Sequence, residues 1–498
     1  MNNKVRTRFA PSPTGYMHIG GLRTALYTYL IAKKNGGTFI LRIEDTDTAR
    51  YVEGATGVII KTLKDAGLNY DEGPDVGGSY GPYVQSERKD LYKPYAVELC
   101  EKGAAYYCFC SVKSDDLPQE KSNDCSVTST DVPHEKPNSF SHVSCSCRDL
   151  KYEDSKKRAD AGESYAIRMK APKEGETKVT DVVFGEVIVQ NKELDDMVLL
   201  KRDLMPTYNF ANVVDDHLMG ITHVMRGSEY ISSAPKYNLL YQAFDWEIPV
   251  YITVSPIMRD ATHKLSKRDG DPTYDDLLND GYLPDAVLNY IALLGWSPGG
   301  ENEFFTLSQL LEVFDVSGIS KSPAIFDIEK LNHFNSEYIR KMTPEEFETI
   351  AEPYIRKVIK NENLSIPAIS RILQARCIKL SEIPEKIDFF ESLPDYDPEL
   401  FVHQKSKTDK MIALEMLFKA KDIFEKLPEW TNDSIHDILI ETAEKLNIKN
   451  ATLMWPVRIA TAGKAVTPGG AVEICSILGR KETLCRIELG IKKLQGDN

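Results

Sequence analysis

A strand–turn–helix–strand pattern at the start of the sequence constrains the fold more than any other feature. Residues 5–10 have the composition of a short buried strand, and the Pro- and Gly-containing stretch 11–15 must turn away from it. Apolar side chains at i, i+3 and i+4 spacing predict an amphipathic helix over 22–33, which Asn35-Gly36-Gly37 would end. Residues 38–43 then predict a second buried strand. This order is typical of the first βαβ unit of a parallel nucleotide-binding sheet.

The turn that precedes this helix is a candidate phosphate site. It reads His18-Ile19-Gly20-Gly21 and lacks the GxGxxG spacing of a dinucleotide-binding fingerprint. A helix N-terminus offers free N–H groups and partial positive charge to a phosphate, and glycines let a base or ribose approach the backbone closely. His18 could donate a hydrogen bond to a phosphate oxygen as charge develops in a transition state. These four residues alone would also fit an ordinary Gly-rich turn with a surface histidine.

A second basic segment lies far along the chain, at residues 263–270. It contains Lys264, Lys267 and Arg268 and ends in Gly270. Two lysines and an arginine on such a loop could close over the β- and γ-phosphates of a nucleotide and stabilise the leaving pyrophosphate. Taken alone, the same run would be an ordinary solvated basic loop.

Together the two segments resemble the paired signatures of class I aminoacyl-tRNA synthetases. The stretch PSPTGYMHIGGLRTAL resembles the HIGH motif in the form used by bacterial-type glutamyl-tRNA synthetases, with Gly21 where the general motif has its second His. The stretch HKLSKRDG resembles the KMSKS loop, with Leu265 and Arg268 as variants. Two weak motifs in the right order and at the right separation make a strong combined signal.

The resemblance covers essentially the whole chain and implies an α/β fold of several domains. It is strongest in 5–47, 200–230 and 260–298 and weakest in 111–150 and 343–450. It implies a Rossmann-type parallel-sheet catalytic domain with an inserted acceptor-stem-binding domain, followed by a stem-contact domain and an all-α C-terminal anticodon-binding region. The implied ranges are 1–83 and 204–260 for the two catalytic halves, 84–203 for the insertion, 261–335 for the stem-contact domain with its KMSKS-like loop, and 336–498 for the helical region.

The same resemblance implies an activity and the residues that carry it. The family ligates L-glutamate to the 3′ end of tRNA(Glu) through a glutamyl-adenylate, using ATP and Mg²⁺ and releasing AMP and diphosphate. His18, Lys264 and Lys267 are implied as catalytic residues that also bind ATP, together with Gly20 and Gly21. The residues implied in glutamate binding are Arg8, Ser12, Glu44, Tyr208, Asn212 and Arg226.

Two of these residues have the right chemistry for an acidic amino acid. Glu44 ends the second expected strand, where open α/β sheets place ligand contacts, and its carboxylate can hold an α-ammonium group. Arg226 follows an expected strand at 221–225, and its planar guanidinium can bind a side-chain carboxylate with two hydrogen bonds. Without the resemblance, Glu44 would be a surface residue and Arg226 an ordinary ion-paired arginine. His217 is expected at the sheet edge and near the nucleotide.

Four cysteines form a candidate zinc site around an irregular segment. Cys108 and Cys110 precede the Ser-, Asp-, Lys- and Pro-rich stretch 111–144, and Cys145 and Cys147 follow it. Four thiolates suit tetrahedral Zn²⁺, and a metal would stabilise a loop that has little apolar core. Bacterial relatives carry C-x-C and then C-x-H here, and Asp149 occupies the place of that His. The fourth ligand is therefore Cys145, with Asp149, His142 or Cys125 as alternatives, and four reduced core cysteines remain the competing interpretation.

The C-terminal part of the chain is expected to be helical. Thr343, Pro344 and Glu346 form the pattern of a capping box with Pro in the first helical turn. Further amphipathic segments are 410–427, 434–446, 453–463 and 471–479.

Composition sets limits on the class of protein. The chain has 498 residues, enough for about three to four domains. It has no run of ~18 apolar residues, so we expect no membrane span. The stretch MNNK runs straight into the first strand, which leaves no room for a signal peptide and predicts a cytoplasmic protein. A net charge of −14 argues against non-specific nucleic-acid coating but allows local basic faces. Nine cysteines without a secretion signal indicate reduced thiols.

The expected partners are tRNA(Glu), L-glutamate and ATP, with Mg²⁺ and one Zn²⁺ per chain, and the expected state is a monomer. Charging of tRNA(Gln) is left open. A glutaminyl-specific relative is the nearer alternative, and Arg226 argues against it because a buried cation favours a carboxylate over an amide. A non-catalytic, zinc-containing tRNA-binding protein is the farther one, and the retention of His18, Lys264 and Lys267 argues against it.

Overall fold

The computed structural model describes residues 4–15, 17–47, 52–110, 145–265 and 270–496, which form two compact units. Unit 1 comprises Met1–Asp276 with Leu288–Asp327, and unit 2 comprises Leu277–Val287 with Ile328–Asn498. Among the described residues, every helix is too short or too polar to cross a lipid bilayer.

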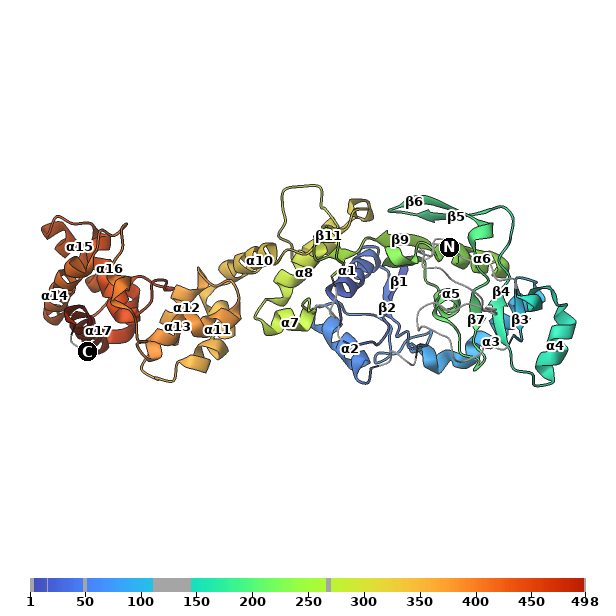
Figure 1. The fold of residues 1–498 in the computed structure, drawn as a ribbon, viewed down its shortest axis with the longest axis horizontal. Helices are drawn as coiled ribbons and strands as arrows, with labels where there is room; N and C mark the ends of the chain where they lie inside the picture. The colour runs from blue at the N-terminus through green and yellow to red at the C-terminus, as the bar shows by residue number, and fades with distance from the viewer. Residues whose placement is uncertain (1–3, 16, 48–51, 111–144, 266–269, 497–498) are drawn as a thin grey trace, which may run out of the picture. The chain divides into compact units, whose positions relative to one another are not determined.

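A six-stranded sheet forms the centre of unit 1 (Figure 1). Its strand order is β2-β1-β8-β9-β5-β6, and the neighbouring strands are parallel except for the antiparallel pair β5 and β6. The strands are β1 (Arg6–Phe9), β2 (Thr38–Leu41), β8 (His223–Gly227), β9 (Val250–Val254), β5 (Glu176–Asp181) and β6 (Gly185–Gln190). The predicted parallel sheet and its first βαβ unit are confirmed.

Helices that cover this sheet follow the expected periodicity. Helix α1 (Ile19–Lys34) has Asn35 as its C-cap. A Cβ atom on Gly37 would lie 2.2 Å from the Val5 carbonyl oxygen, so only glycine fits the turn that follows. The residue spacing over 208–218 predicts a helix, and α5 (Tyr208–Leu218) has these bounds. The remaining helices of this part are α2 (Ala55–Asp65) and α6 (Ala234–Phe244). One apolar core joins α5 and α6 to β8 and β9.

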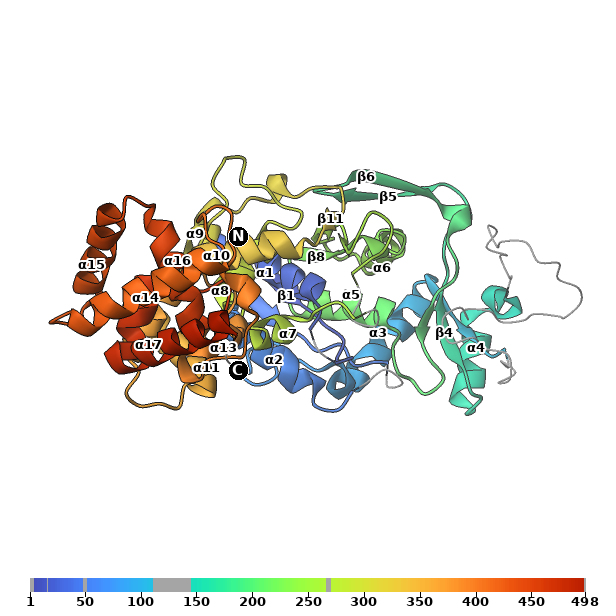
Figure 2. The same ribbon diagram turned by 60° about the vertical axis from the view of Figure 1, so that its left-hand side comes forward.

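A smaller three-stranded sheet lies within residues 84–203. It has the order β3-β4-β7, with β3 (Ala105–Cys108), β4 (Ala166–Met169) and β7 (Val198–Leu200) all antiparallel to their neighbours. Helices α3 (Lys89–Glu101) and α4 (Tyr152–Asp160) accompany it. Figure 2 shows that the chain continues from β4 into a long hairpin formed by β5 and β6.

The β5–β6 hairpin belongs to the main sheet although it lies inside the range expected for the insertion. Asp181 of β5 pairs in register with Tyr251 of β9, and alternate residues of β5 are buried. The alternation of apolar and polar residues predicts strands in this stretch. Such alternation does not identify the neighbouring strand, so the sheet to which the two strands belong could not be predicted.

The rest of unit 1 follows the second basic segment. Strands β10 (Ile257–Met258) and β11 (Ala324–Ile325) form a parallel pair, and α9 (Leu307–Val313) begins with a capping box at Thr306. Helices α7 (Tyr274–Asn279) and α8 (Pro284–Ala292) follow, and each has residues in both units.

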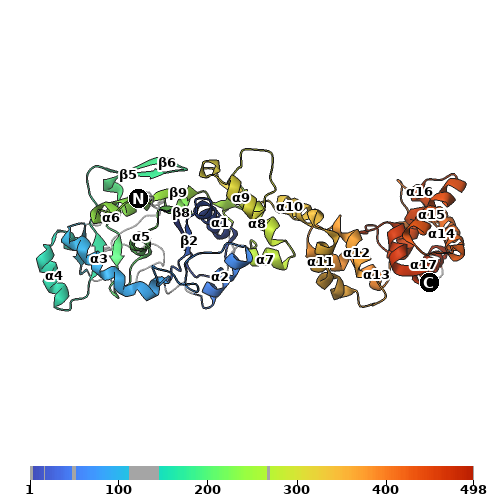
Figure 3. The same ribbon diagram turned by 180° about the vertical axis from the view of Figure 1, so that it is seen from behind.

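The described part of unit 2 is helical (Figure 3) apart from its connections. Its helices are α10 (Ile328–Lys341), α11 (Pro344–Val358), α12 (Ile366–Gln374), α13 (Ile383–Glu391), α14 (Lys410–Lys426), α15 (Asn432–Lys445), α16 (Asn450–Ala462) and α17 (Ala471–Gln495). The capping box between Thr343 and Glu346 is confirmed. The helix expected over 471–479 ends at Gly479, whose φ is 77°, and a second helical stretch to Gln495 extends beyond the prediction.

Candidate active site

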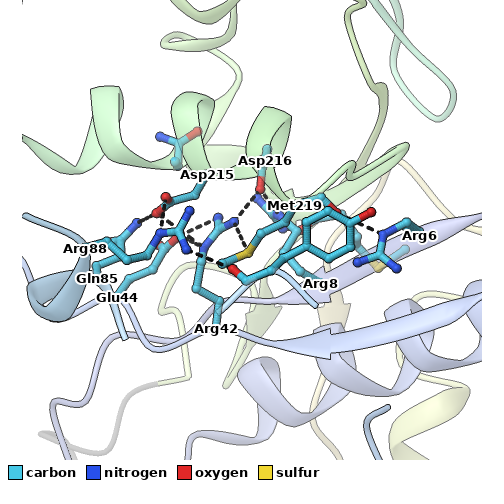
Figure 4. Close-up of polar contacts among 12 residues, drawn as sticks. Arg6, Arg8, Arg42, Glu44, Gln85, Arg88, Asp215, Asp216 and Met219 are labelled. Atoms are coloured by element: carbon cyan, nitrogen blue, oxygen red, sulfur yellow. Dashed lines mark hydrogen bonds and ion pairs between the residues drawn. The ribbon is translucent and has the colours of Figure 1, made fainter. Parts of the chain in front are cut away.

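Charged side chains gather beneath helix α5, where the parallel strands of the main sheet end (Figure 4). Arg8 comes from β1, Arg42 follows β2, and α5 contributes Asp215 and Asp216. Arg42, Asp215 and Asp216 are at most 1% exposed, so their charges must be balanced within the protein. We call the set Arg8, Arg42, Glu44, Arg88, Asp215, Asp216 and Arg226 the arginine–carboxylate cluster.

Asp216 joins two arginines from neighbouring strands. Its Oδ1 accepts from Arg8 Nε at 2.9 Å and lies 2.8 Å from Arg42 Nη1. Burial alone would raise the pKa of this carboxyl, but the charges of Arg8 and Arg42 outweigh burial and lower it. Arg8 also donates from Nη1 to the Met225 carbonyl oxygen at 3.3 Å. Asp216 therefore fixes the position of a predicted glutamate-binding arginine.

Asp215 connects the same helix to the start of α3. It accepts from Arg88 Nε at 2.7 Å, Gln85 Nε2 at 2.9 Å and the Tyr92 hydroxyl at 2.9 Å. Arg42 Nε lies 4.0 Å from its second oxygen. Sequence reasoning missed Arg42, Gln85, Arg88, Asp215 and Asp216. A usable signal was the Asp215-Asp216 pair inside an otherwise apolar helix, since buried carboxylates need cationic partners.

Glu44 is buried, so its interpretation as a surface residue is wrong. It is 3% exposed, and its Oε1 accepts from Arg42 Nη2 at 2.8 Å and Nε at 3.2 Å. Its Oε2 is buried and has no hydrogen-bond partner among the described residues. Burial raises the pKa of Glu44, and the nearby charges of Arg42 and Arg8 only partly oppose this. One carboxylate oxygen is therefore available to a cationic ligand.

Arg226 is the cluster's cation without a carboxylate partner among the described residues. Its guanidinium lies 4.8 Å from the Tyr237 ring centroid and 4.9 Å from that of Tyr251, and it is 8% exposed. Its Nη1 is buried and unpartnered within the described part of the chain. Arg226 and Tyr251 line a small cavity. An anionic group there would satisfy both the charge and the free donor.

Tyr208 and Asn212 lie on the side of α5 that joins this site. Asn212 is 1% exposed and donates to the Tyr208 carbonyl oxygen at 2.8 Å. The Tyr208 ring centroid lies 5.5 Å from that of Tyr230. Burial, followed by the charge of Glu44, raises the pKa of Tyr208, so its hydroxyl remains a neutral donor. By contrast, Ser12 is exposed. His217 is exposed and stacks on Trp246 with ring centroids 3.7 Å apart.

His18 caps the N-terminus of α1. Its Nδ1 accepts from the Gly20 backbone N–H at 3.0 Å, so the neutral ring carries its proton on Nε2. Nε2 is buried and has no partner among the described residues. Burial lowers the pKa of His18, and the Lys264 ammonium lowers it further. A Cβ on Gly20 would lie 3.2 Å from His18 Nδ1, whereas one on Gly21 would meet nothing closer than 3.7 Å.

The second basic segment begins as a tight hairpin. Leu265 N donates to the Ile257 carbonyl oxygen at 3.0 Å, and Arg259 N donates to the His263 carbonyl oxygen at 2.8 Å. Lys264 is exposed at the end of this hairpin, and its charge acts on His18. Lys267 lies outside the described residues. The structure thus brings His18 and Lys264 together and leaves Lys267 as a prediction.

The four predicted cysteines form one cluster. Their sulfur atoms all lie within 4.8 Å of one another, with Cys108–Cys145 and Cys110–Cys145 at 3.5 Å and Cys110–Cys147 at 3.7 Å. Tetrahedral zinc with bonds of about 2.3 Å would hold its sulfur ligands about 3.8 Å apart, so the cluster is compatible with zinc. Asp149 is exposed and is not part of the cluster. Cys125 and His142 lie outside the described residues.

Comparison with known proteins gives a consistent family. The catalytic-domain model of the class I tRNA synthetases for E and Q matches residues 4–333, and an anticodon-binding-domain model matches residues 328–491. A glutamate–tRNA ligase of Clostridium acetobutylicum is 52% identical over 493 residues, 99% of each chain. One from Clostridium kluyveri is 53% identical over 498 residues, 99% of this chain and 100% of that one.

A solved structure agrees with these relatives. The crystal structure of a glutamate tRNA ligase from Elizabethkingia meningosepticum in complex with its amino acid superposes with a TM-score of 0.84 at 32% identity, covering 99% of this chain and 100% of that one. The matches span both units and the segments that carry the arginine–carboxylate cluster and His18. The chain therefore belongs to the glutamate–tRNA ligases, which are class I aminoacyl-tRNA synthetases.

Proposed function

We propose that the arginine–carboxylate cluster is the pocket in which this ligase holds glutamate. The observation that carries the proposal is that two oppositely charged side chains each have one buried atom without a hydrogen-bond partner among the described residues, Glu44 Oε2 and Arg226 Nη1. Glutamate offers an α-ammonium to the first and a side-chain carboxylate to the second. The cluster contains four guanidinium groups (Arg8, Arg42, Arg88, Arg226) against three carboxylates (Glu44, Asp215, Asp216), so it has one excess positive charge. Glutamate, with its net charge of −1, would neutralise it.

The other pocket residues have supporting roles in this proposal. Arg8, oriented by Asp216, adds positive charge near the substrate carboxylates. Tyr208 and Asn212 from α5 supply neutral polar atoms and walls, and Ser12 is assigned to the same pocket from the family motif. A pocket whose groups are already fixed by ion pairs loses little freedom when the substrate binds.

For the first chemical step we propose that His18, Lys264 and Lys267 stabilise the phosphates of ATP. An oxygen of the glutamate α-carboxylate attacks the α-phosphorus, and the bond to the β-phosphate oxygen breaks, which releases diphosphate. His18 Nε2–H and the α1 N-terminus, with Gly20 and Gly21, would donate to phosphate oxygens. The two lysines would balance the charge on the departing diphosphate, and Mg²⁺ bound to ATP would share that role.

In the second step a hydroxyl of the terminal ribose of tRNA attacks the glutamyl carbonyl and AMP leaves.

We propose that a basic patch of unit 2, formed by Arg376 and Arg458, contacts the anticodon arm of tRNA. Arg458 Nη2 and Arg376 Nη1 donate, each at 2.8 Å, to the carbonyl oxygens of Ala465 and Thr467. Burial and the Arg376 charge lower the pKa of Arg458, whose guanidinium lies 4.4 Å from the Trp455 ring. Two cations beside an aromatic ring suit a phosphate and a stacked base.

We also propose one structural Zn²⁺ per chain at Cys108, Cys110, Cys145 and Cys147. The proposal is supported by four convergent thiols in a segment whose own core is small.

For the domains we keep the ranges 1–83, 84–203, 204–260, 261–335 and 336–498, and residues 176–190 add two strands to the catalytic sheet. A monomeric, cytoplasmic enzyme remains our expectation.

Glutamate-dependent ATP–pyrophosphate exchange in the presence of tRNA tests the phosphate assignments. Lys267→Ala should lower the exchange rate on the order of 10²-fold, the usual effect of removing one transition-state charge contact, with little change in tRNA affinity. An unchanged rate would make the segment a surface loop without a catalytic role.

Charging purified tRNA(Glu) and tRNA(Gln) side by side decides whether both are substrates. Arg376→Ala should raise the KM for each tRNA that is charged.

A further inference from the structure

Helix α1 carries a buried arginine that the assignments above do not use. Arg23 lies five residues after His18 on the same helix and is 3% exposed. Its Nη1 donates to the Leu294 carbonyl oxygen at 2.7 Å, and its Nη2 donates to the Ser255 carbonyl oxygen. The Nε atom is buried without a hydrogen-bond partner among the described residues.

The two carbonyl groups belong to segments that frame the phosphate site. Ser255 follows the C-terminal end of β9 and lies two residues before the Ile257–Leu265 hairpin that bears Lys264. Leu294 follows the end of α8, where the last carbonyl groups of the helix have no helical donor. Tyr27, one turn after Arg23, donates to Ala292 and Leu294 carbonyl oxygens at 2.9 and 3.2 Å. One face of α1 therefore holds both segments.

Arg23 brings a positive charge to this junction, and none of the ion pairs among the described residues includes its guanidinium. Burial lowers the pKa of Arg23, and Tyr27 and then Glu229 oppose this. Burying an unpaired guanidinium carries a large desolvation free energy. A neutral donor such as Tyr27 would bind the same backbone carbonyl groups with a smaller one. The same charge acts on the neighbouring imidazole. Burial is the main cause of the lowered pKa of His18, Lys264 and then Arg23 lower it further, and the Leu265 backbone and Asp271 oppose this.

The backbone opposite Arg23 is shaped to receive it. Gly295 has a φ of +92°, and a Cβ built on it would lie 3.2 Å from Arg23 Nη1. A side chain at this position would be strained in its backbone and would press on the guanidinium.

We propose that Arg23 is a positioning residue for the adenylation step, which holds the Lys264 hairpin against the N-terminus of α1. Its charge at this place also disfavours a second positive charge on the His18 imidazole. This inference rests on the phosphate roles proposed for His18 and Lys264. It extends them to a residue that never touches the substrate. Its charge explains why an arginine, rather than a second neutral donor, occupies the junction.

The first test follows the imidazole directly in the full-length protein without substrates. The ¹³C-labelled histidine signals are titrated by NMR in the wild type, Arg23→Gln and Tyr27→Phe, and His18→Gln identifies the His18 signal. Arg23→Gln should raise the pKa of His18. Tyr27→Phe should not, because it removes hydrogen bonds to the same carbonyl groups without removing a charge. Equal titration in all three proteins would overturn the electrostatic part of the proposal.

The second test measures exchange kinetics at matched active-site concentration. Arg23→Gln should lower kcat about 10- to 100-fold, as when other orienting partners are removed, and should leave the KM for glutamate near the wild-type value. The acid limb of its pH–rate profile should move to higher pH, because His18 would then become charged at higher pH. Tyr27→Phe should reduce thermal stability with kcat within about twofold of the wild type.

A third variant covers the case in which Arg23→Gln does not fold. Arg23→Lys keeps the charge but has a compact head that cannot reach both carbonyl groups as a planar fork does. It should keep the His18 titration and still lose kcat. Wild-type kcat in Arg23→Lys would show that the fork does not position the hairpin. If His18→Gln itself leaves exchange unchanged, the proposed role of His18 fails, independently of any Arg23 result.

Discussion

Unit 1 contains two buried polar clusters that are balanced in opposite ways. In the arginine–carboxylate cluster, cations and anions from different strands and helices neutralise one another almost completely. Among the described residues, one atom each of Arg226, Glu44 and Asp216 is buried without a hydrogen-bond partner. In the cysteine cluster, four groups of one kind converge within 4.8 Å of one another. The first is assembled by the protein's own charges, whereas the second would need a metal ion to balance its charge if the four cysteines are thiolates.

The difference predicts that the two clusters fail differently. Removing one member of the charge cluster leaves its partner buried and unpaired, so stability and specificity should change while the fold persists. Removing one thiol should release the metal and with it the local order of the segment. Four experiments examine this contrast, and they are described from the largest expected effect to the smallest.

Cys108→Ser should abolish metal binding. The native chain should contain about one Zn²⁺, whose binding contributes on the order of 10 kcal/mol to the stability of such a site. Atomic emission measures the zinc content, and hydrogen exchange of residues 105–108 and 166–169 measures local order. Cys100→Ser is the control, since Cys100 is buried outside the cluster and its loss should leave zinc in place. Native protein without zinc would contradict the site.

Asp216→Asn should destabilise unit 1 by about 3–5 kcal/mol, the usual effect of breaking a buried ion pair from one side. Arg8 and Arg42 would both lose their shared anion. Denaturant unfolding monitored on unit 1 measures the loss. The matched control is Asp65→Asn, which breaks the largely exposed Lys61–Asp65 pair and should leave stability close to unchanged. Equal effects of the two substitutions would mean that Asp216 is not an anchor.

Arg226→Gln should separate specificity from stability. The kcat/KM for glutamate should fall roughly 10³-fold, since the substrate carboxylate loses its cation, and the preference over glutamine should narrow. Glu44→Gln should weaken both amino acids about equally, because they share the α-ammonium. Aminoacylation kinetics with both substrates measure the ratio. An unchanged glutamate-to-glutamine ratio in Arg226→Gln would make Arg226 a structural residue.

The smallest effect concerns pH. Asp216 has a lowered folded pKa, so its stabilisation is present above its unfolded pKa of about 3.9 and is lost as pH falls through the folded value. Glu44 has a raised folded pKa, so its contribution is fully present below about 4.3 and is lost as pH rises through the folded value. Glu44→Gln should therefore become more stable relative to the wild type as pH rises from 4 to 7, by about 2 °C or less in Tm. A relative stability independent of pH would contradict the shift.

Local patterns in the sequence were sufficient for several elements of both units. The bounds of α5 at Tyr208 and Leu218 and the Thr343–Glu346 capping box follow from side-chain spacing within a few residues, and the structure confirms both. Gly479 correctly predicts the end of the first helical stretch of α17. The second stretch was missed because the residues after Gly479 do not indicate that another helix begins immediately.

The candidate site was predictable only in part, because its contacts are distant in sequence. Asp216 reaches Arg8 across 208 positions, and Asp215 reaches Arg88 across 127. The family motif names the residues that face the substrate, but it gives no ion-pair partner for them. The convergence of Cys145 with Cys108 and Cys110 was expected from spacing because the choice of zinc ligands limits the possible arrangements.

The β5–β6 hairpin limits how this enzyme can be cut and recombined. A deletion designed at residues 84–203 would remove two strands of the catalytic sheet and leave β9 as an open edge, whose unpaired N–H and C=O groups invite aggregation. Residues 176–190 are therefore part of the catalytic framework, although they are reached only after the chain has built the smaller sheet. An exchange of residues 84–203 between relatives has to leave this hairpin with the recipient.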